Sequence, residues 1–531
     1  MSMEKRIRII ERLCVVGIIL LSAVILFGLW LLNAAERPAP EPKPAPEAAL
    51  TEGVGYLPDG VYYGKRLPVT TFRAGDGSPR DLNDYAGRKL MLLFWGSWCP
   101  YCDGALRAWQ AYEAALSEHP DYDLVLVNKL DPDKGETVEK ALAYLAERGI
   151  PFECLYDQGL TAYKAYGLKR IPTLLILDEQ GYVRCMTADV PATLPELQDM
   201  LAYVESGGAA ATERFLLENM LGEDGGLFTT YMDKRGAPPT GRDVLSESQG
   251  LLMEYAALTR NRALFERCWQ YARERLGREG LFAWYATGDG KQADANALID
   301  DLRIYRALTS ADALWGGLEA ERAGLAGAIL TRNAPGGRLA GFYDFPQKRA
   351  GSVLPLFSLD LEALEALGLR RQAEAILRGG YISDAFPLYY SSYDHATGTY
   401  SAESLNTSEA LTALWHAARA GVAEQVSLDW LEQRVVSGTL AARYDTDGQV
   451  VKGFDYHSTA AYAIAALIGA QTGNARLYTF ARHRMEAYAV TEPSALRGSF
   501  SGRADGGDII AFDQLMPLLV YASTREITFD D

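Results

Sequence analysis

Two cysteines separated by two residues, Cys99 and Cys102, stand in the segment Trp98-Cys99-Pro100-Tyr101-Cys102. They follow an apolar run at 90–95, whose length and composition predict a buried parallel strand. This spacing allows both sulfurs to lie in the first turn of the next helix, where the helix dipole stabilises a thiolate on Cys99 and Cys102 can close a disulfide. The pattern therefore favours thiol–disulfide chemistry carried by the pair itself, with no other cofactor. A metal site would need further ligands at similar spacing, whereas the other cysteines are scattered singly: Cys14, Cys154, Cys185 and Cys268.

A second motif, Ile171-Pro172-Thr173, precedes another apolar run at 174–177. With the cysteine motif, it makes the chain from about residue 55 to about residue 205 similar to the thioredoxin superfamily, and in particular to its TlpA/ResA-like branch. The resemblance implies an α/β thioredoxin-like domain in which Pro172 is cis and packs beside Cys99 and Cys102. A cis bond is costly except before proline. Trp98 adds an aromatic rim suited to docking a partner chain.

Many thioredoxins carry a buried acid at the position of Leu93, where it accepts the proton of the second cysteine during exchange. Water or another side chain must take over that role here. We expect Cys99 to attack the disulfide of an extracytoplasmic protein and Cys102 to resolve the mixed disulfide, with an external electron donor restoring the pair. An inert, purely structural domain is disfavoured because Cys99, Cys102 and Pro172 are all present.

The N-terminus predicts a membrane anchor. Four basic residues within 1–12 precede an uncharged apolar stretch at 13–32, which is long enough to cross the hydrocarbon core of a bilayer. The basic residues place 1–12 in the cytoplasm and the rest of the chain outside the cell membrane. A cleaved signal peptide is the alternative, but Asn33-Ala34-Ala35 is a poor cleavage site. The Pro-rich segment at 33–54 reads as an extended spacer, so we expect a single-pass bacterial envelope protein.

The chain has 531 residues, a net charge of −17 and a sequence pI near 5.0. This charge argues against nucleic acid as a partner. The length leaves room for two domains beyond the anchor, and six cysteines are too few for a disulfide scaffold.

From about residue 210 to residue 531 the sequence changes to amphipathic helices joined by Gly-rich loops. Their number favours an all-α toroid of two concentric rings, an (α/α)6 fold. Three aromatic segments, at 281–285, 342–345 and 387–390, could stack on sugar rings or face the core. The expected helices are 213–220, 246–259, 263–276, 295–308, 318–331, 355–367, 370–377, 407–420, 427–442, 458–472, 475–488 and 509–524.

Two acidic motifs in this half are more specific. Val244-Leu245-Ser246-Glu247-Ser248-Gln249-Gly250 and Asp300-Asp301-Leu302-Arg303-Ile304 resemble two motifs of glycoside hydrolase family 8. The resemblance implies that Glu247 is a general acid and that Asp301 holds the sugar at the cleavage point. The family has a further aspartate where this chain has Ile299, so either acid of the second motif could be the match.

The residues leave several alternatives open. Glu247 could simply belong to a capping box of Ser246 and Gln249. Asp301 falls on the apolar stripe of its helix, which calls for a partner or a function. An inverting glycosidase also needs a second carboxylate as base. Asp344 and Asp455 are candidates. Asn406 stands near the expected place in helix order, with Glu409 three residues on, where a capping box would put it. The sequence does not choose among these positions.

Two functions of the toroid follow. It hydrolyses an extracellular or wall polysaccharide of the β-glucan type, or it only binds glycan or protein beside the redox domain.

Overall fold

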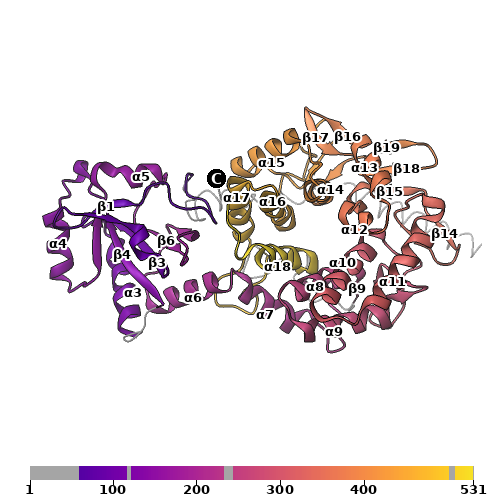
Figure 1. Ribbon diagram of the computed structural model, residues 1–531, viewed down its shortest axis with the longest axis horizontal. Helices are drawn as coiled ribbons and strands as arrows, with labels where there is room; N and C mark the ends of the chain where they lie inside the picture. The colour runs from indigo at the N-terminus through magenta and orange to yellow at the C-terminus, as the bar shows by residue number, and fades with distance from the viewer. Residues whose placement is uncertain (1–58, 116–120, 233–242, 502–508, 530–531) are drawn as a thin grey trace, which may run out of the picture. The chain divides into compact units, whose positions relative to one another are not determined.

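The computed structural model describes residues 59–531, apart from 116–120, 233–242, 502–508 and 530–531 (Figure 1). The predicted cytoplasmic segment, the anchor at 13–32 and the spacer at 33–54 lie outside the described residues. Within the described part of the chain, no helix has the length and hydropathy needed to span a membrane.

A seven-stranded mixed sheet forms the first domain, with the strand order β2-β1-β5-β4-β3-β6-β7. The central strand β3 is parallel to β4 and antiparallel to β6. β3 corresponds to the apolar run that precedes the cysteines, and six of its seven residues are buried. The strands are β1 (Thr71–Arg73), β2 (Pro79–Asp81), β3 (Lys89–Trp95), β4 (Tyr122–Asn128), β5 (Glu153–Tyr156), β6 (Thr173–Leu177) and β7 (Val183–Thr187).

Hydrophobic clusters lie on both faces of this sheet. Side chains of β3 alternate between the clusters, with Leu93 and Trp95 in one and Leu92 and Phe94 in the other. The first cluster includes residues of α3 and α6, and the second includes residues of α5. This α/β arrangement confirms the thioredoxin-like fold class. The helices are α3 (Cys102–Ala115), α4 (Val138–Glu147), α5 (Thr161–Ala165) and α6 (Leu194–Glu205).

Twelve helices, α7 to α18, build the rest of the described chain. Six of them form a closed inner ring, because α8, α10, α12, α14, α16 and α18 each contact the next and α18 returns to α8. The other six precede or follow these along the chain and pack outside them (Figure 1). The inner helices are α8 (Ser246–Leu258), α10 (Leu298–Trp315), α12 (Leu361–Ala366), α14 (Thr407–Arg419), α16 (Thr459–Gln471) and α18 (Ala511–Thr524). The outer helices are α7 (Ala209–Asn219), α9 (Arg262–Tyr271), α11 (Glu319–Ala328), α13 (Arg370–Gly379), α15 (Gln425–Ser437) and α17 (Ala475–Glu486).

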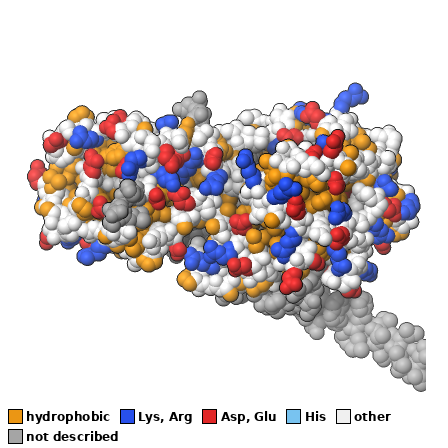
Figure 2. Space-filling model, turned by 60° about the horizontal axis from the view of Figure 1, so that its bottom comes forward, with side chains coloured by type: hydrophobic (Ala, Val, Ile, Leu, Met, Phe, Trp, Pro, Cys, Tyr) orange, Lys and Arg blue, Asp and Glu red, His pale blue; other side chains and the backbone are white. Residues whose placement is uncertain are grey.

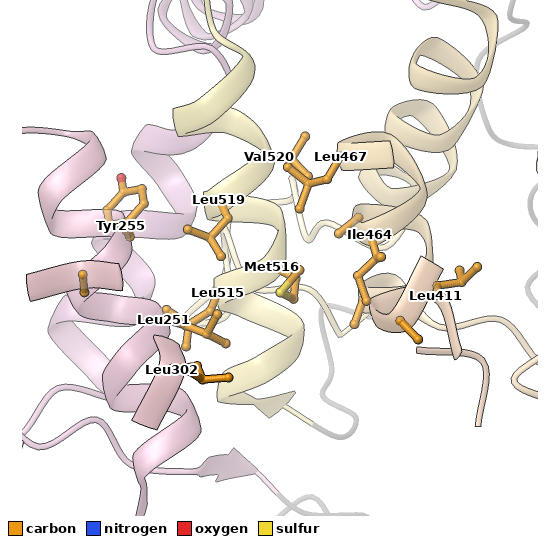
Figure 3. Packing of buried hydrophobic residues seen from close by; sticks show 14 of the residues in the cluster. Leu251, Tyr255, Leu302, Leu411, Ile464, Leu467, Leu515, Met516, Leu519 and Val520 are labelled. Atoms are coloured by element: carbon orange, nitrogen blue, oxygen red, sulfur yellow. The ribbon is translucent and has the colours of Figure 1, made fainter. Parts of the chain in front are cut away.

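Burial separates the two rings. In α16, eleven of the thirteen residues are buried, whereas the outer helix α13 buries three of ten along one stripe. Side chains from α8, α10, α14, α16 and α18, including Leu251, Leu302 and Met516, lie close together in the core (Figure 3). Each predicted helix overlaps one of the twelve, with ends that differ by a few residues.

Short antiparallel strand pairs connect the helices. Several of them place residues directly before an inner helix, as β9 does for α8 and β20 does for α14. The pairs are β10 (Gly277–Arg278) with β11 (Leu281–Phe282), β12 (Tyr285–Ala286) with β9 (Val244–Leu245), β13 (Tyr343–Asp344) with β14 (Arg349–Ala350), β16 (Tyr381–Ser383) with β17 (Phe386–Tyr389), β20 (Leu405–Asn406) with β21 (Arg443–Tyr444) and β22 (Ile509–Ile510) with β8 (Thr230–Met232), besides the three-stranded sheet of β15 (Val353–Pro355), β18 (Ser392–Asp394) and β19 (Thr399–Ser401).

Candidate functional site

The cysteine pair lies where β3 turns into α3. Cys99 and Cys102 are joined by a disulfide, and α3 begins at Cys102. The peptide bond between Ile171 and Pro172 is cis, and the Ile171 carbonyl oxygen lies 3.6 Å from Cys99 Sγ. Cys102 is fully buried, whereas 4% of Cys99 is exposed, so Cys99 is the sulfur that a partner can reach. The neighbouring Tyr101 is 79% exposed and forms part of the rim.

Trp98 is held on this rim by its neighbours. The ammonium groups of Lys129 and Lys134 lie 5.7 and 5.4 Å from the centroid of its ring, at distances typical of cation–π contacts. A methyl group on Gly96 would come within 2.9 Å of the indole nitrogen. Glycine at this position therefore allows the indole to fold back over the turn that leads to Cys99.

A buried carboxylate, Glu136, fixes the same turn from another segment. Its oxygens accept hydrogen bonds from the Ser97 backbone N–H at 2.9 Å, the Ser97 hydroxyl at 2.5 Å and the Asn128 side-chain amide at 2.8 Å. Only 7% of Glu136 is exposed. Leu93, which stands where many thioredoxins have an acid, is fully buried in the hydrophobic core. The carboxylate of this region thus comes from a loop after β4 and not from β3.

The remaining described cysteines are unsuited to exchange. Cys154, Cys185 and Cys268 are free, and burial raises the pKa of each thiol to about 12. Only a minute fraction would be thiolate near neutral pH. Cys154 and Cys185 are partly buried, and the two do not form a second bridge.

In the toroid, Arg303 joins two carboxylates near the N-terminus of α8. Its Nη1 donates to Glu247 and to Asp300, at 3.1 Å in both cases. The other oxygen of Asp300 accepts from the Ser246 hydroxyl at 2.7 Å. The Glu247 side chain is 30% exposed, against 7% for Asp300, so Glu247 is the more accessible of the two carboxylates. Burial raises the pKa of Asp300 to about 6, with a smaller contribution from the charge on Glu247.

The capping box that Ser246 and Gln249 could have formed is absent from the described helix α8. Leu245 is the N-cap residue and makes no side-chain cap. The Gln249 amide instead binds the backbone of Leu227, Gly225 and Cys268. Helix capping therefore does not account for Glu247.

Asp301 is fully buried, and its contacts are with other segments than α8. Its two oxygens accept from the Phe282 backbone N–H at 3.0 Å and from the Asn296 side-chain amide at 2.5 Å. Burial raises the pKa of this carboxyl well above its usual range. The same amide of Asn296 donates to Asn333, and its carbonyl accepts from the Tyr343 backbone. Asp301 thus connects α10 to the segments that carry two of the aromatic stretches.

Glu409 lies in the first turn of α14. Burial raises the pKa of Glu409, and the negative charge of Glu247 raises it further, while Arg443 opposes both. The ring order places α14 three inner helices away from α8. Glu409 and Glu247 therefore belong to helices on opposite sides of the inner ring.

The other two candidate bases are placed differently. Asp344 lies in the β13–β14 hairpin, and its oxygens accept from the backbone and side chain of Gln347, at 2.8 Å in both cases. Asp455 is exposed, four residues before α16. Among the described residues, neither carboxylate shows a contact with Glu247.

Some site residues carried no sufficient signal in the sequence. Glu136 lies 34 residues after Cys102 in a polar loop, and only the fold brings it to the turn. Arg303 belongs to the acidic motif at 300–304, but nothing in the sequence indicated that it would bind two carboxylates. Glu409 was noted as a possible capping residue, but Asn406 alone caps α14, through the Ser408 N–H.

Comparison with known proteins supports this division of the chain. Residues 63–201 match the Redoxin family model. Over 110 residues, the chain is 27% identical to the thiol-disulfide oxidoreductase ResA of Halalkalibacterium halodurans, a match that covers 20% of this chain and 58% of that protein. The resemblance of the first domain to ResA-type proteins is thereby confirmed.

Two further matches involve a larger share of the chain. It is 28% identical over 320 residues to the "Putative lipoprotein YdaJ" of Bacillus subtilis, covering 58% of this chain and 84% of that protein. A structure described as a novel alpha-amylase from Clostridium perfringens superposes with a TM-score of 0.54 at 26% identity, covering 59% of this chain and 96% of that one. The chain thus joins a thioredoxin-like domain, similar to ResA-type thiol-disulfide oxidoreductases, to a helical, glycosidase-like domain.

Proposed function

We propose that the protein is a membrane-tethered, extracytoplasmic oxidoreductase whose toroid hydrolyses a glucan. Two observations support the proposal. In the first domain, the Cys99–Cys102 pair lies at the start of a helix beside cis Pro172. In the toroid, Glu247 and Glu409 each lie in the first turn of an inner helix, α8 and α14.

In the redox step, the thiolate of reduced Cys99 attacks one sulfur of a partner's disulfide. A Cys99–partner disulfide forms, and the other partner sulfur leaves as a thiolate. The Cys102 thiolate then attacks Cys99 Sγ and releases the second partner thiol. Two electrons pass to the partner, and the Cys99–Cys102 disulfide seen in the structure is the oxidised product.

A trapping experiment tests this step. Reduced full-length protein is treated with an alkylating reagent at a range of pH values, and labelled residues are identified by mass spectrometry. We expect Cys99 to react first, with a thiol pKa below the usual value of about 8.5, while Cys102, Cys154 and Cys185 react slowly. Reaction at Cys154 or Cys185 before Cys99 would contradict the assignment.

In the toroid, Glu247 acts as proton donor and Glu409 as the carboxylate that activates water. Arg303 binds Glu247 and is available to stabilise the negative charge that develops when Glu247 gives up its proton. Asp301 holds the wall segments in place through Phe282 and Asn296.

The substrate class is a glucan. The alpha-amylase at 26% identity favours α-linked glucose polymers as the first to test. The acidic motifs led us to expect a β-glucan, which is the second arm of the same assay.

The experiment compares Glu247→Gln and Glu409→Gln with a matched control, Glu266→Gln, an exposed acid paired with Arg262 on the outer helix α9. Hydrolysis of soluble starch and of a mixed-linkage β-glucan is followed by release of reducing ends. We expect the rate of reducing-end release to fall about 10²–10⁴-fold in each active-site variant and to stay unchanged in the control.

Two further measurements distinguish the roles of the two carboxylates. Glu247→Gln should keep most of its activity on an aryl glycoside, because that leaving group needs no proton. Azide should partly restore the activity of Glu409→Gln, because azide can act as the nucleophile in place of the activated water. Unchanged activity in both variants would refute the proposed pair.

A second candidate function is binding without hydrolysis. It is favoured by Asn406, an uncharged residue at the start of α14, and by Ile299, where the similar family has an aspartate. In that case the protein would retain starch or β-glucan in a sedimentation assay without releasing reducing ends.

The location is part of the same proposal, and it rests on the sequence at 1–54. Cell fractionation and protease treatment of intact cells test it. We expect the protein in the membrane fraction, with the toroid digested from outside. Recovery of the whole chain in the soluble cytoplasmic fraction would contradict it.

A further inference from the structure

A hollow of about 1120 Å³ lies in the toroid next to the β13–β14 hairpin. It is formed by the C-terminal end of the segment that follows α11 and by the hairpin itself. We call it the hairpin groove. Its lining residues are Thr331, Arg332, Pro335, Arg338, Phe342, Tyr343, Asp344, Gln347, Lys348, Arg349, Ala350, Gly351 and Ser352.

Positive charge is concentrated in the hairpin groove. Four of the lining residues are cationic, and Asp344 is the one carboxylate among them. Glu279, nearby, contacts Lys348 and lies 3.9 Å from Arg332. Even with Glu279 counted, the lining carries four positive charges against two negative ones. A chain with a net charge of −17 would not be expected to gather cations in a hollow by composition alone.

Two of these cations, Arg338 and Arg349, have unused donors. Both side chains are exposed, and among the described residues neither shows a side-chain hydrogen bond or ion pair. Over most of the face shown in Figure 2, by contrast, basic and acidic side chains are interspersed. A guanidinium group presents a planar fork of N–H donors that fits a carboxylate or a phosphate. The hairpin groove therefore contains two guanidinium groups that can bind an anionic ligand.

An exposed aromatic ring stands beside the charges. Phe342 is 37% exposed, and its ring lies against Gly351, where an added methyl group would be 2.4 Å from a ring carbon. Glycine at 351 thus lets the ring lie across the neighbouring strand. An aromatic face next to anion-binding groups suits a sugar unit that carries a negative charge, because the ring packs against the apolar face of the sugar.

The hairpin groove is attached to the element that carries part of the candidate active site. The Leu298 N–H at the start of α10 donates to the Gly341 carbonyl at 2.8 Å, and Asn296 exchanges two hydrogen bonds with the Tyr343 backbone. Asp300 and Arg303 follow on the same helix. A polymer held in the groove would be bound at the N-terminal end of α10.

We propose that the hairpin groove binds an anionic polysaccharide. Its carboxylate or phosphate groups contact Arg338 and Arg349, and a sugar ring packs on Phe342. Uronate residues and phosphodiester links share the chemistry that these arginines recognise. Binding at this groove does not require hydrolysis by the toroid.

The experiment measures binding of full-length protein to three immobilised polymers: polygalacturonate, a poly(glycerol phosphate) and neutral amylose. The test variant is Arg338→Gln/Arg349→Gln. The matched control is Arg273→Gln/Arg371→Gln, which removes two exposed arginines of outer-ring segments. We expect the test variant to bind an anionic polymer about tenfold or more weakly, with a smaller salt dependence, and the control to bind like the wild type.

Further arms separate the outcomes. Binding to polygalacturonate alone or to the phosphate polymer alone supports the proposal and identifies the group. Phe342→Ala should weaken binding to these polymers but not to inorganic phosphate, because phosphate offers no sugar face. Glu247→Gln should bind like the wild type, which keeps this test separate from that of hydrolysis. Equal losses in the test and control variants, no binding to either anionic polymer, or equally tight binding to single-stranded DNA would overturn the proposal.

Discussion

The two candidate sites of this chain are built in opposite ways. In the redox domain, Trp98, Cys99 and Cys102 are close in sequence, at the end of one buried strand and the start of one helix. In the toroid, Glu247, Arg303 and Glu409 come from three different inner helices. The first site is thus largely a local structure, whereas the second exists only when the ring of helices has closed.

This difference affects how each site depends on its surroundings. The redox turn needs support from a few remote groups, of which Glu136 and the Ile171 carbonyl are the nearest. In the toroid, almost every polar contact of the site joins distant segments, as between Ser246 and Asp300. We therefore expect substitutions in the redox turn to change rates, and substitutions in the toroid to change stability as well.

The largest expected effect is at the cysteines. Cys99→Ser should reduce disulfide-exchange turnover by at least about 10³-fold, because it removes the attacking nucleophile. Cys102→Ser should instead accumulate a mixed disulfide with an insulin substrate, visible on a non-reducing gel. Cys268→Ser, a change at a buried thiol of the toroid, is the control for exchange and should react at the wild-type rate. Trapping by Cys99→Ser in place of Cys102→Ser would reverse the assigned roles.

In the toroid, Asp301→Ala should lower the free energy of unfolding by about 2–3 kcal/mol. The substitution leaves the buried Phe282 N–H and the Asn296 amide without their acceptor. Chemical unfolding monitored by fluorescence measures the effect. Asp447→Ala, at an exposed turn residue, should stay within about 0.5 kcal/mol of the wild type. If both variants were equally stable, Asp301 would not be the structural link that its contacts indicate.

The same contrast explains what could be predicted from the sequence. The cysteine pair stands in a contiguous motif, and the thioredoxin-like fold and cis Pro172 were expected because such motifs resemble those of the thioredoxin superfamily. The twelve toroid helices follow from periodicity. Periodicity does not tell which carboxylates converge, because it fixes the face of a helix but not its neighbours in the ring. Asp301 was correctly expected to point inward, yet its partners, Phe282 and Asn296, could not be foreseen.

A smaller effect is expected at Glu136, the remote support of the redox turn. Glu136→Ala should slow insulin reduction about tenfold, because the Ser97 N–H and the Asn128 amide lose their acceptor. Glu136→Gln should restore most of the rate, since its oxygen can accept both bonds and its amide can donate to the Ser97 hydroxyl. The alkylation rate of Cys99 as a function of pH should change less in the Gln variant than in the Ala variant. Equal slowing in both would mean that the charge, and not the hydrogen bonding, is what the turn requires.

The smallest expected effect is a change in pH dependence caused by Asp300→Asn. Burial raises the pKa of Asp300 to about 6 in the folded protein, against about 3.9 in an unfolded chain. Between these values the folded state holds a proton that the unfolded state has lost, so stability falls as pH rises from about 4 to about 6.

Asparagine cannot titrate, but its oxygen can accept from Arg303 and its amide can donate to Ser246. Between pH 4 and pH 6, the free energy of unfolding of the variant should therefore rise by about 1–3 kcal/mol relative to that of the wild type. Chemical unfolding at several pH values measures this difference. Parallel curves would mean that Arg303 holds Asp300 ionised throughout. In that case Arg303 would be committed to Asp300 as well as to Glu247, and less of its charge would be available to stabilise Glu247 as it loses its proton.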